Sequence, residues 1–101
     1  MRVLINVRIP HEPFNAMVRD GTAGAAIQSI LDELQPEAAY FYDPDGHRGG
    51  VFVVDIEDSA QLPSLAEPFF LAFEAECDVH IAMAPEDLAR AGLDRLGQRW
   101  G

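Results

Sequence analysis

Four polar side chains interrupt otherwise apolar stretches of this sequence, and their types are those needed for proton-transfer chemistry. Asn6 and Arg8 interrupt RVLINVRI, Asp55 interrupts GVFVVDIE, and His80 interrupts DVHIAMA. An imidazole titrates near neutral pH and moves protons, while arginine and asparagine stabilise a developing enolate or phenolate oxygen. Asp55 would fix the tautomer of His80 or pair with Arg8. These residues form the candidate catalytic set.

Two tyrosines extend this set, and a structural interpretation stands beside the functional one. Tyr40 and Tyr42 share one face of the run EAAYFY and are candidate ligand-binding residues. Alternatively, Arg8 and Asp55 form an ordinary ion pair between neighbouring strands or at the seam of a dimer, and His80 is hydrogen-bonded there and chemically idle. Structural ion pairs produce the same pattern of residues as a catalytic site.

The segment DPDGHRGG has the glycine content of a phosphate-binding loop, but it lacks the required context. Such a loop follows a strand, precedes a helix and ends in Gly-Lys-Ser/Thr, whereas this segment has no lysine or hydroxyl residue and a strand follows it. Asp45-Gly46 is typical of a hairpin turn, and the later glycine pair permits a bulge. We predict a turn with His47 and Arg48 at its tip in water.

No metal or prosthetic group is expected. The three histidines, at positions 11, 47 and 80, lie in different elements, and one cysteine cannot build a structural zinc site. A haem needs only one histidine, but a lone strand histidine such as His80 is more often simply packed. Cys77 has no partner for a disulfide and is interpreted as an inert apolar residue.

Periodicity predicts the elements that position these side chains. A strand ends at Pro10, a helix with apolar residues three and four apart covers Pro13–Leu34, and a cap at Asp58-Ser59 begins a second helix. The predicted strands are 2–9, 37–42, 50–57 and 78–84, the second helix is 59–76, and a short helix starting at Pro85 fades in GQRWG. This βαββαβ order predicts one ferredoxin-like α+β domain over residues 1–101, with a four-stranded antiparallel sheet and both helices on one face.

The other face of that sheet is then uncovered, although several of its side chains are apolar. By strand parity it carries Leu4, Val51, Val53 and Ala82, together with the candidate site residues. A contiguous exposed apolar face is a liability in a monomer, and a second copy related by two-fold symmetry covers it most simply. We therefore expect a homodimeric barrel in which the candidate residues converge.

Charge and length limit the partners. The 101 residues carry a formal charge of −10, which opposes binding to nucleic-acid phosphates and anionic membrane surfaces. The start of the chain, MRVLINVRIP, is too polar for a secretory segment, and no stretch reaches the apolar length of a membrane span. We expect a cytoplasmic protein.

The element order, the length and the segment AEPFFLAFEAECDVHIAMAPEDL resemble small bacterial proteins of the dimeric α/β-barrel superfamily. The resemblance covers Arg2 to about Leu93 as topology and pattern. It implies a homodimer whose two sheets form a barrel, with a small-molecule cavity inside the barrel or between sheet and helices. Characterised members include muconolactone isomerases, cofactor-independent quinol monooxygenases, chlorite dismutases and haem-degrading monooxygenases, and their site residues differ.

The leading functional hypothesis is a small homodimer that binds a small, largely apolar molecule. The second is an enzyme without a cofactor, a monooxygenase, isomerase or cyclase acting on an aromatic or enolisable substrate. In that enzyme His80 is the acid/base, and Asn6 and Arg8 stabilise the oxyanion. The third is a non-catalytic interaction module whose acidic surface binds a basic protein.

Overall fold

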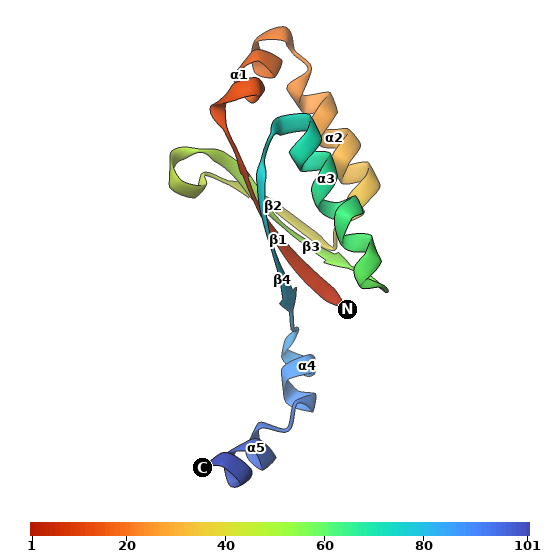
Figure 1. Ribbon diagram of the computed structural model, residues 1–101, viewed down its shortest axis with the longest axis vertical. Helices are drawn as coiled ribbons and strands as arrows, with labels where there is room; N and C mark the ends of the chain where they lie inside the picture. The colour runs from red at the N-terminus through yellow and green to blue at the C-terminus, as the bar shows by residue number, and fades with distance from the viewer.

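A computed structural model describes all residues from 1 to 101, and it contains the predicted α+β arrangement (Figure 1). None of its helices has both the length and the apolar character needed to cross a membrane. The elements in chain order are β1 (Arg2–Ile9), α1 (His11–Asp20), α2 (Ala23–Leu34), β2 (Ala38–Tyr42), the short 3-10 helix η1 (Pro44–Gly46), β3 (Arg48–Asp55), the 3-10 helix η2 (Ser59–Gln61), α3 (Leu62–Phe73), β4 (Glu76–Ala82), α4 (Pro85–Arg90) and α5 (Leu93–Trp100).

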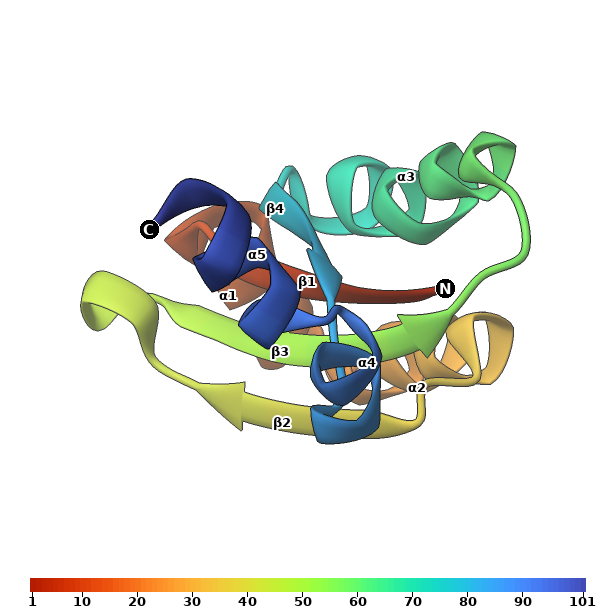
Figure 2. The same ribbon diagram turned by 90° about the horizontal axis from the view of Figure 1, so that it is seen from below.

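The four strands form one antiparallel sheet in the order β2-β3-β1-β4, which is the ferredoxin-like order. β1 lies in the centre, where Leu4 pairs with Val53 of β3 on one side and with His80 of β4 on the other. Figure 2 is seen from the side on which α4 and α5 project, and β2 and β3 run side by side across this view. The central position of β1 explains why its sequence alternates most strictly.

One face of the sheet forms the hydrophobic core with α1, α2 and α3. In β1 every second residue is buried, and Ile5 is fully inaccessible to solvent. Phe52 of β3 lies 5.2 Å from Phe69 of α3, measured between ring centroids. β-branched and aromatic side chains suit this half-buried surface because they pack well on a pleated sheet. The core contains Val3, Ile5, Val7, Ile9, Phe14, Ala23, Ile30, Leu34, Phe52, Val54, Ile56, Leu65, Phe69, Phe73 and Ala75.

The predicted helix over Pro13–Leu34 is wrong in one respect, because the structure has two helices there. Gly21 adopts the left-handed conformation, with φ at 82°, and ends α1. The backbone N–H of Thr22 then donates to the carbonyl oxygen of Met17 at 2.9 Å, which closes the helix end. A residue with a side chain rarely adopts this φ, so glycine at this position is what separates α1 from α2.

The second predicted helix is confirmed, including its cap at Asp58. The carboxylate of Asp58 accepts from the N–H of Ala60 at 2.8 Å, and the side-chain oxygen of Gln61 accepts from the N–H of Asp58 at 2.9 Å. Pro63 lies in the first turn of α3, and the helix continues through Pro68 to Phe73. Aromatic side chains of α3 thus reach the core.

The C-terminal residues differ from the prediction. The short helix from Pro85 is present as α4, but the chain does not fade in GQRWG, because α5 continues to Trp100. Both helices project from the end of β4 away from the sheet (Figure 1), and we call residues 83–101 the arm. The radius of gyration, 16.9 Å, reflects this projection, since a compact domain of this size has about 13 Å.

Candidate functional site

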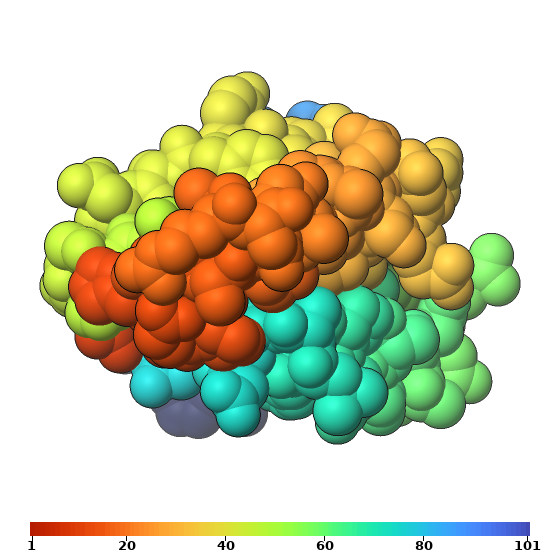
Figure 3. All heavy atoms as spheres, turned by 90° about the horizontal axis from the view of Figure 1, so that it is seen from above, coloured from red at the N-terminus to blue at the C-terminus, as the bar shows by residue number.

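Three segments meet at one end of the sheet, which we call the turn end. Ile9 is the last residue of β1 and pairs with Arg48, the first residue of β3. The start of α1 and the turn between β2 and β3 therefore lie beside each other. Figure 3 looks onto this end and shows the start of α1, in red and orange, next to the turn, in yellow-green.

The turn folds back over the sheet instead of extending into water. Asp45 and Gly46 both adopt left-handed conformations, with φ at 52° and 77°, and the N–H of His47 donates to the carbonyl oxygen of Pro44 at 3.0 Å. Asp45-Gly46 thus forms the predicted turn. The expectation of a solvated tip is wrong for His47, which is half-buried against His11, whereas Arg48 is exposed as expected although its guanidinium contacts Phe14.

His47 stacks on His11, with ring centroids 4.7 Å apart and ring planes inclined by 25°. The Nδ1 atom of His47 lies 3.1 Å from the carbonyl oxygen of Asp45 and 3.2 Å from Nη2 of Arg8, and its Nε2 atom lies 3.4 Å from the same Nη2. Two imidazoles and a guanidinium are therefore in direct contact at the turn end.

Arg48 attaches the turn to α1. Its guanidinium carbon lies 4.9 Å from the centroid of the Phe14 ring, a cation–π contact, and its Nη1 donates to Oδ1 of Asn15 at 2.7 Å. Since Phe14 is buried in the core, Arg48 links the position of the turn to the packing of α1.

An open cleft of about 650 Å³ lies between the turn and the start of α1. This volume is within the range of small-molecule sites. The side of the cleft toward the core is apolar, and its rim carries both stacked imidazoles and Arg48. The lining residues are Ile9, His11, Phe14, Ile27, Phe41, Tyr42, Asp43, Gly46, His47, Arg48 and Gly49.

The cleft does not continue into the core. Below it the space between sheet and helices contains a void of about 10 Å³, lined by Phe52, Phe69 and Phe73 among others. A void of this size holds at most about one water molecule. A ligand of the cleft would therefore lie at the turn end, against the imidazoles.

The opposite face of the sheet brings together three of the residues predicted from sequence. The hydroxyl of Tyr42 donates to Oδ1 of Asn6 at 3.4 Å, and Arg8 pairs with Glu76 at 3.3 Å. A shallower hollow of about 330 Å³ lies against these four side chains. Arg8 thus lines this hollow beside Glu76, and it also contacts His47 at the rim of the cleft.

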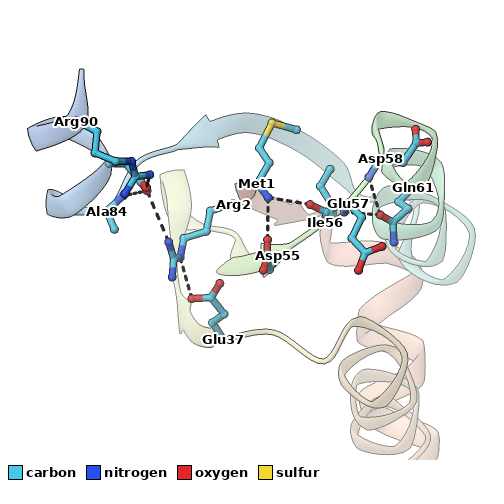
Figure 4. A network of polar contacts seen from close by, with 11 residues as sticks. Met1, Arg2, Glu37, Asp55, Ile56, Glu57, Asp58, Gln61, Ala84 and Arg90 are labelled. Carbon is cyan, nitrogen blue, oxygen red and sulfur yellow. Dashed lines mark hydrogen bonds and ion pairs between the residues drawn. The ribbon is translucent and has the colours of Figure 1, made fainter. Parts of the chain in front are cut away.

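Asp55 lies at the other end of the sheet and does not join them. It pairs with Arg2, six residues along β1 from Arg8, which corresponds to about 20 Å. Its carboxylate accepts from the N-terminal amine at 2.9 Å (Figure 4). This hydrogen bond and the charge of the amine lower the pKa of Asp55. Within one chain, Asp55 neither pairs with Arg8 nor orients His80.

His80 and Tyr40 are on the predicted face but stand apart from both hollows. His80 pairs with Leu4 in the sheet, lies 3.3 Å from the carboxylate of Asp78, and its side chain is 60% exposed. Tyr40 pairs with Val51, and its side chain extends into solvent. One chain therefore brings Asn6, Arg8 and Tyr42 together and leaves His80, Tyr40 and Asp55 outside.

The remaining titratable groups do not add a metal or nucleophile site. No group of three or more histidine, cysteine, aspartate or glutamate side chains is placed to hold a metal ion. Burial raises the pKa of the Cys77 thiol to about 11, so this thiol is protonated at neutral pH.

His11 and His47 were not assigned to the site from sequence. A topological signal for them was present, because in a βαββαβ chain the end of the first strand and the turn between the second and third strands lie at the same end of the sheet. His11 follows the first strand directly, and His47 lies in that turn.

No family model and no curated protein matches this chain. Among solved structures, it is similar to 5-chloro-2-hydroxyhydroquinone dehydrochlorinase from Burkholderia phenoliruptrix, solved in complex with 2,5-dihydroxybenzoquinone, with a TM-score of 0.64 and 17% identity over 85% of this chain and 97% of that one. It is also similar to part of a formyltetrahydrofolate deformylase from Pseudomonas putida, with a TM-score of 0.50 and 13% identity over 81% of this chain and 29% of that one. At these identities the similarity shows the ferredoxin-like fold alone.

Proposed function

We propose that this chain binds a small planar molecule, largely apolar but carrying a hydroxyl or oxyanion, in the cleft at the turn end. The observation that carries the proposal is the contact of two stacked imidazoles, backed by Arg8, with the rim of a cleft whose inner side is apolar. Apolar walls with a few convergent polar groups are characteristic of small-molecule sites.

The geometry favours an aromatic ligand with an oxygen substituent. Phe14 and Phe41 offer apolar surface to a ring, while His11, His47 and Arg48 offer N–H donors to an oxygen at the rim. The dehydrochlorinase with the same fold holds 2,5-dihydroxybenzoquinone, a planar molecule of this class. That precedent concerns the neighbour's own site and supports only the choice of probe.

Binding is tested with 2,5-dihydroxybenzoquinone and a panel of hydroxybenzoates, measured by calorimetry and thermal unfolding. A ligand present at 100 times its dissociation constant raises the midpoint of a domain this size by roughly 10–20 °C. We expect His47→Asn to weaken binding about tenfold or more, because a charge-assisted or neutral hydrogen bond to the ligand is lost.

His80→Asn is the matched control, since it replaces the same type of side chain on β4, outside the cleft. It should leave the affinity unchanged. Absence of binding across the panel, or equal losses in the two variants, would overturn the proposal.

A second function, acid–base catalysis without a cofactor, is favoured by one contact. The imidazole of His47 lies beside the guanidinium of Arg8, whose Nη2 is 3.2 Å from Nδ1 and 3.4 Å from Nε2. There, His47 would accept a proton from a ligand hydroxyl while Arg8 stabilises the resulting oxyanion. Since His80 lies outside the cleft, His47 replaces it in the acid–base role.

The absorption spectrum of a bound nitrophenol distinguishes these two functions, because its neutral and ionised forms differ in colour. Catalytic competence predicts that binding lowers the apparent pKa of the nitrophenol, and that His47→Asn abolishes this change. An unchanged titration in the complex means that the site binds without moving the proton.

We further propose that two copies cover each other's open sheet faces. Leu4, Val51 and Val53 are only half-buried on that face, and Tyr40 beside them is 68% exposed. Burial of this apolar surface favours association. Sedimentation equilibrium at micromolar concentrations should find a dimer, and a single chain there would exclude the barrel.

A further inference from the structure

The arm exposes apolar side chains that its own chain does not cover. On α5, Leu93, Leu96 and Trp100 are three and four residues apart and so share one helix face. Leu96 is 46% exposed and Trp100 is 75% exposed. A helix of eight residues has little stability alone in water, so this face needs a packing partner.

The charges of the arm and of the body are complementary. Residues 1–82 contain four arginines and fourteen carboxylates, whereas residues 83–101 contain three of each. In α5 the only acidic residue is Asp94, while Arg95 and Arg99 flank the apolar face. The acidic body therefore repels the arm far less than it repels a second acidic surface.

The open sheet face has the matching pattern along β4. Glu76 and Asp78 project from this face on either side of the strand position of Cys77, and both side chains are 77% exposed. Residues two apart on a strand are about 6.7 Å apart, and residues four apart on a helix are about 6 Å apart. The two carboxylates thus match the spacing of Arg95 and Arg99. Their present pairs with Arg8 and His80 are exposed and weak.

The arm cannot easily use its own open face. Its root is fixed at the end of β4 opposite the turn end, where Asp87 accepts from the N–H of Ala84 at 2.9 Å and pairs with Arg2 at 3.7 Å (Figure 4). From there it continues away from the sheet, which gives the molecule its 59 Å length. The two helices of the arm, of six and eight residues, add up to about 21 Å at 1.5 Å per residue, which is close to the length of the seven-residue strand β4.

We propose that α5 of one copy packs on the β4 side of the open sheet face of a second copy, with Arg95 and Arg99 against Glu76 and Asp78. This inference rests on the two-copy assembly proposed above and adds the exchange of arms. The rest of each open face remains for contact between the sheets.

Charge reversal tests the pairing in the full chain. Arg95→Glu with Arg99→Glu should raise the dimer dissociation constant about tenfold or more in sedimentation, and so should Glu76→Arg with Asp78→Arg. All four substitutions together should restore most of the affinity. Arg19→Glu, which reverses an exposed arginine on α1, is the control and should have no effect.

Trp100 is the only tryptophan, so its fluorescence reports directly on the arm. We expect blue-shifted emission in the dimer and a red shift on dilution that parallels dissociation. A dimer with solvent-exposed Trp100, or charge reversals without rescue, overturns arm exchange and leaves the two-copy assembly standing. A monomer overturns both, and a monomer with buried Trp100 shows that the arm folds onto its own chain.

Ligand binding is measured separately through His47, so its failure does not depend on the arm.

Discussion

Gly49→Ala should destabilise the protein and displace the turn that carries His47. Gly49 is buried in β3 opposite Arg8, and the ring of Pro44 from η1 packs directly on it. A methyl group built at Gly49 would lie 2.6 Å from Cγ and 2.8 Å from Cδ of Pro44, and it would also meet the carbonyl oxygen of Val7. The Val7 oxygen belongs to the central strand and cannot retreat without loss of sheet pairing.

The expected magnitude follows from this clash. Overpacking of a tightly packed site costs about 1–3 kcal/mol, and each kcal/mol lowers the midpoint of a domain of this size by about 4–8 °C. We therefore expect a fall of roughly 5–20 °C in thermal unfolding followed by circular dichroism. Movement of Pro44 also separates His47 from His11, which changes the ring-current shifts of both imidazoles in NMR spectra.

Gly24→Ala is the matched control, because a methyl group at Gly24 in α2 meets nothing within 4 Å. This substitution should stabilise the protein by about 0.5 kcal/mol through helix propensity. A Gly49→Ala protein that is as stable as the parent, with unshifted imidazole resonances, would refute the close approach of the turn to the sheet.

Three further predictions concern groups outside the cleft. Gly21→Ala should lower the free energy of unfolding by about 1 kcal/mol, because alanine is strained at the left-handed φ that ends α1, and urea unfolding measures this loss. Cys77 should react with iodoacetamide near pH 8 at least ~30-fold more slowly in the folded protein than in urea, because burial raises its pKa. For Asp55 the folded-state pKa is lowered by the N-terminal amine, so its contribution to stability is present at neutral pH and is lost as the pH falls through that pKa. Asp55→Asn should accordingly lower the urea midpoint at neutral pH, and its difference from the parent protein should vanish in strong acid; a constant difference would contradict the ion pair.

The sheet and its order follow from local patterns in the sequence, although β3 and β4 each begin and end two residues earlier than predicted. Strand β1 was predicted at its observed boundaries, because alternation runs unbroken from Val3 to Ile9 and Pro10 cannot continue it. The first helix was predicted as a single element, because apolar spacing continues across the Gly21-Thr22 break. The apolar spacing stays the same on both sides of this break, although the helix changes direction there. Periodicity alone therefore does not reveal the break.

The candidate site was only partly predictable, since parity fixes a face but not a position along the strand. Asn6, Arg8 and His80 were assigned to the correct face, yet His80 lies four residues along β1 from the position of Arg8. The stacking of His47 on His11 depends on two left-handed residues in a three-dimensional turn, and no periodicity encodes it. A single short helix from Pro85 that fades in GQRWG was predicted, whereas the left-handed Gly92, with φ at 73°, divides it and α5 continues to Trp100.

The position of β4 as an outer strand has a consequence for handling the protein. Its free backbone edge is a template on which strands of other molecules can add, and proteins commonly guard such edges with charge. In β4 that guard consists of Glu76 and Asp78, which repel an identical strand only while ionised. Without this charge, the strand is free to seed β-sheet aggregation. Glu76→Gln with Asp78→Asn should accordingly give turbid, thioflavin-positive material from an otherwise clear solution.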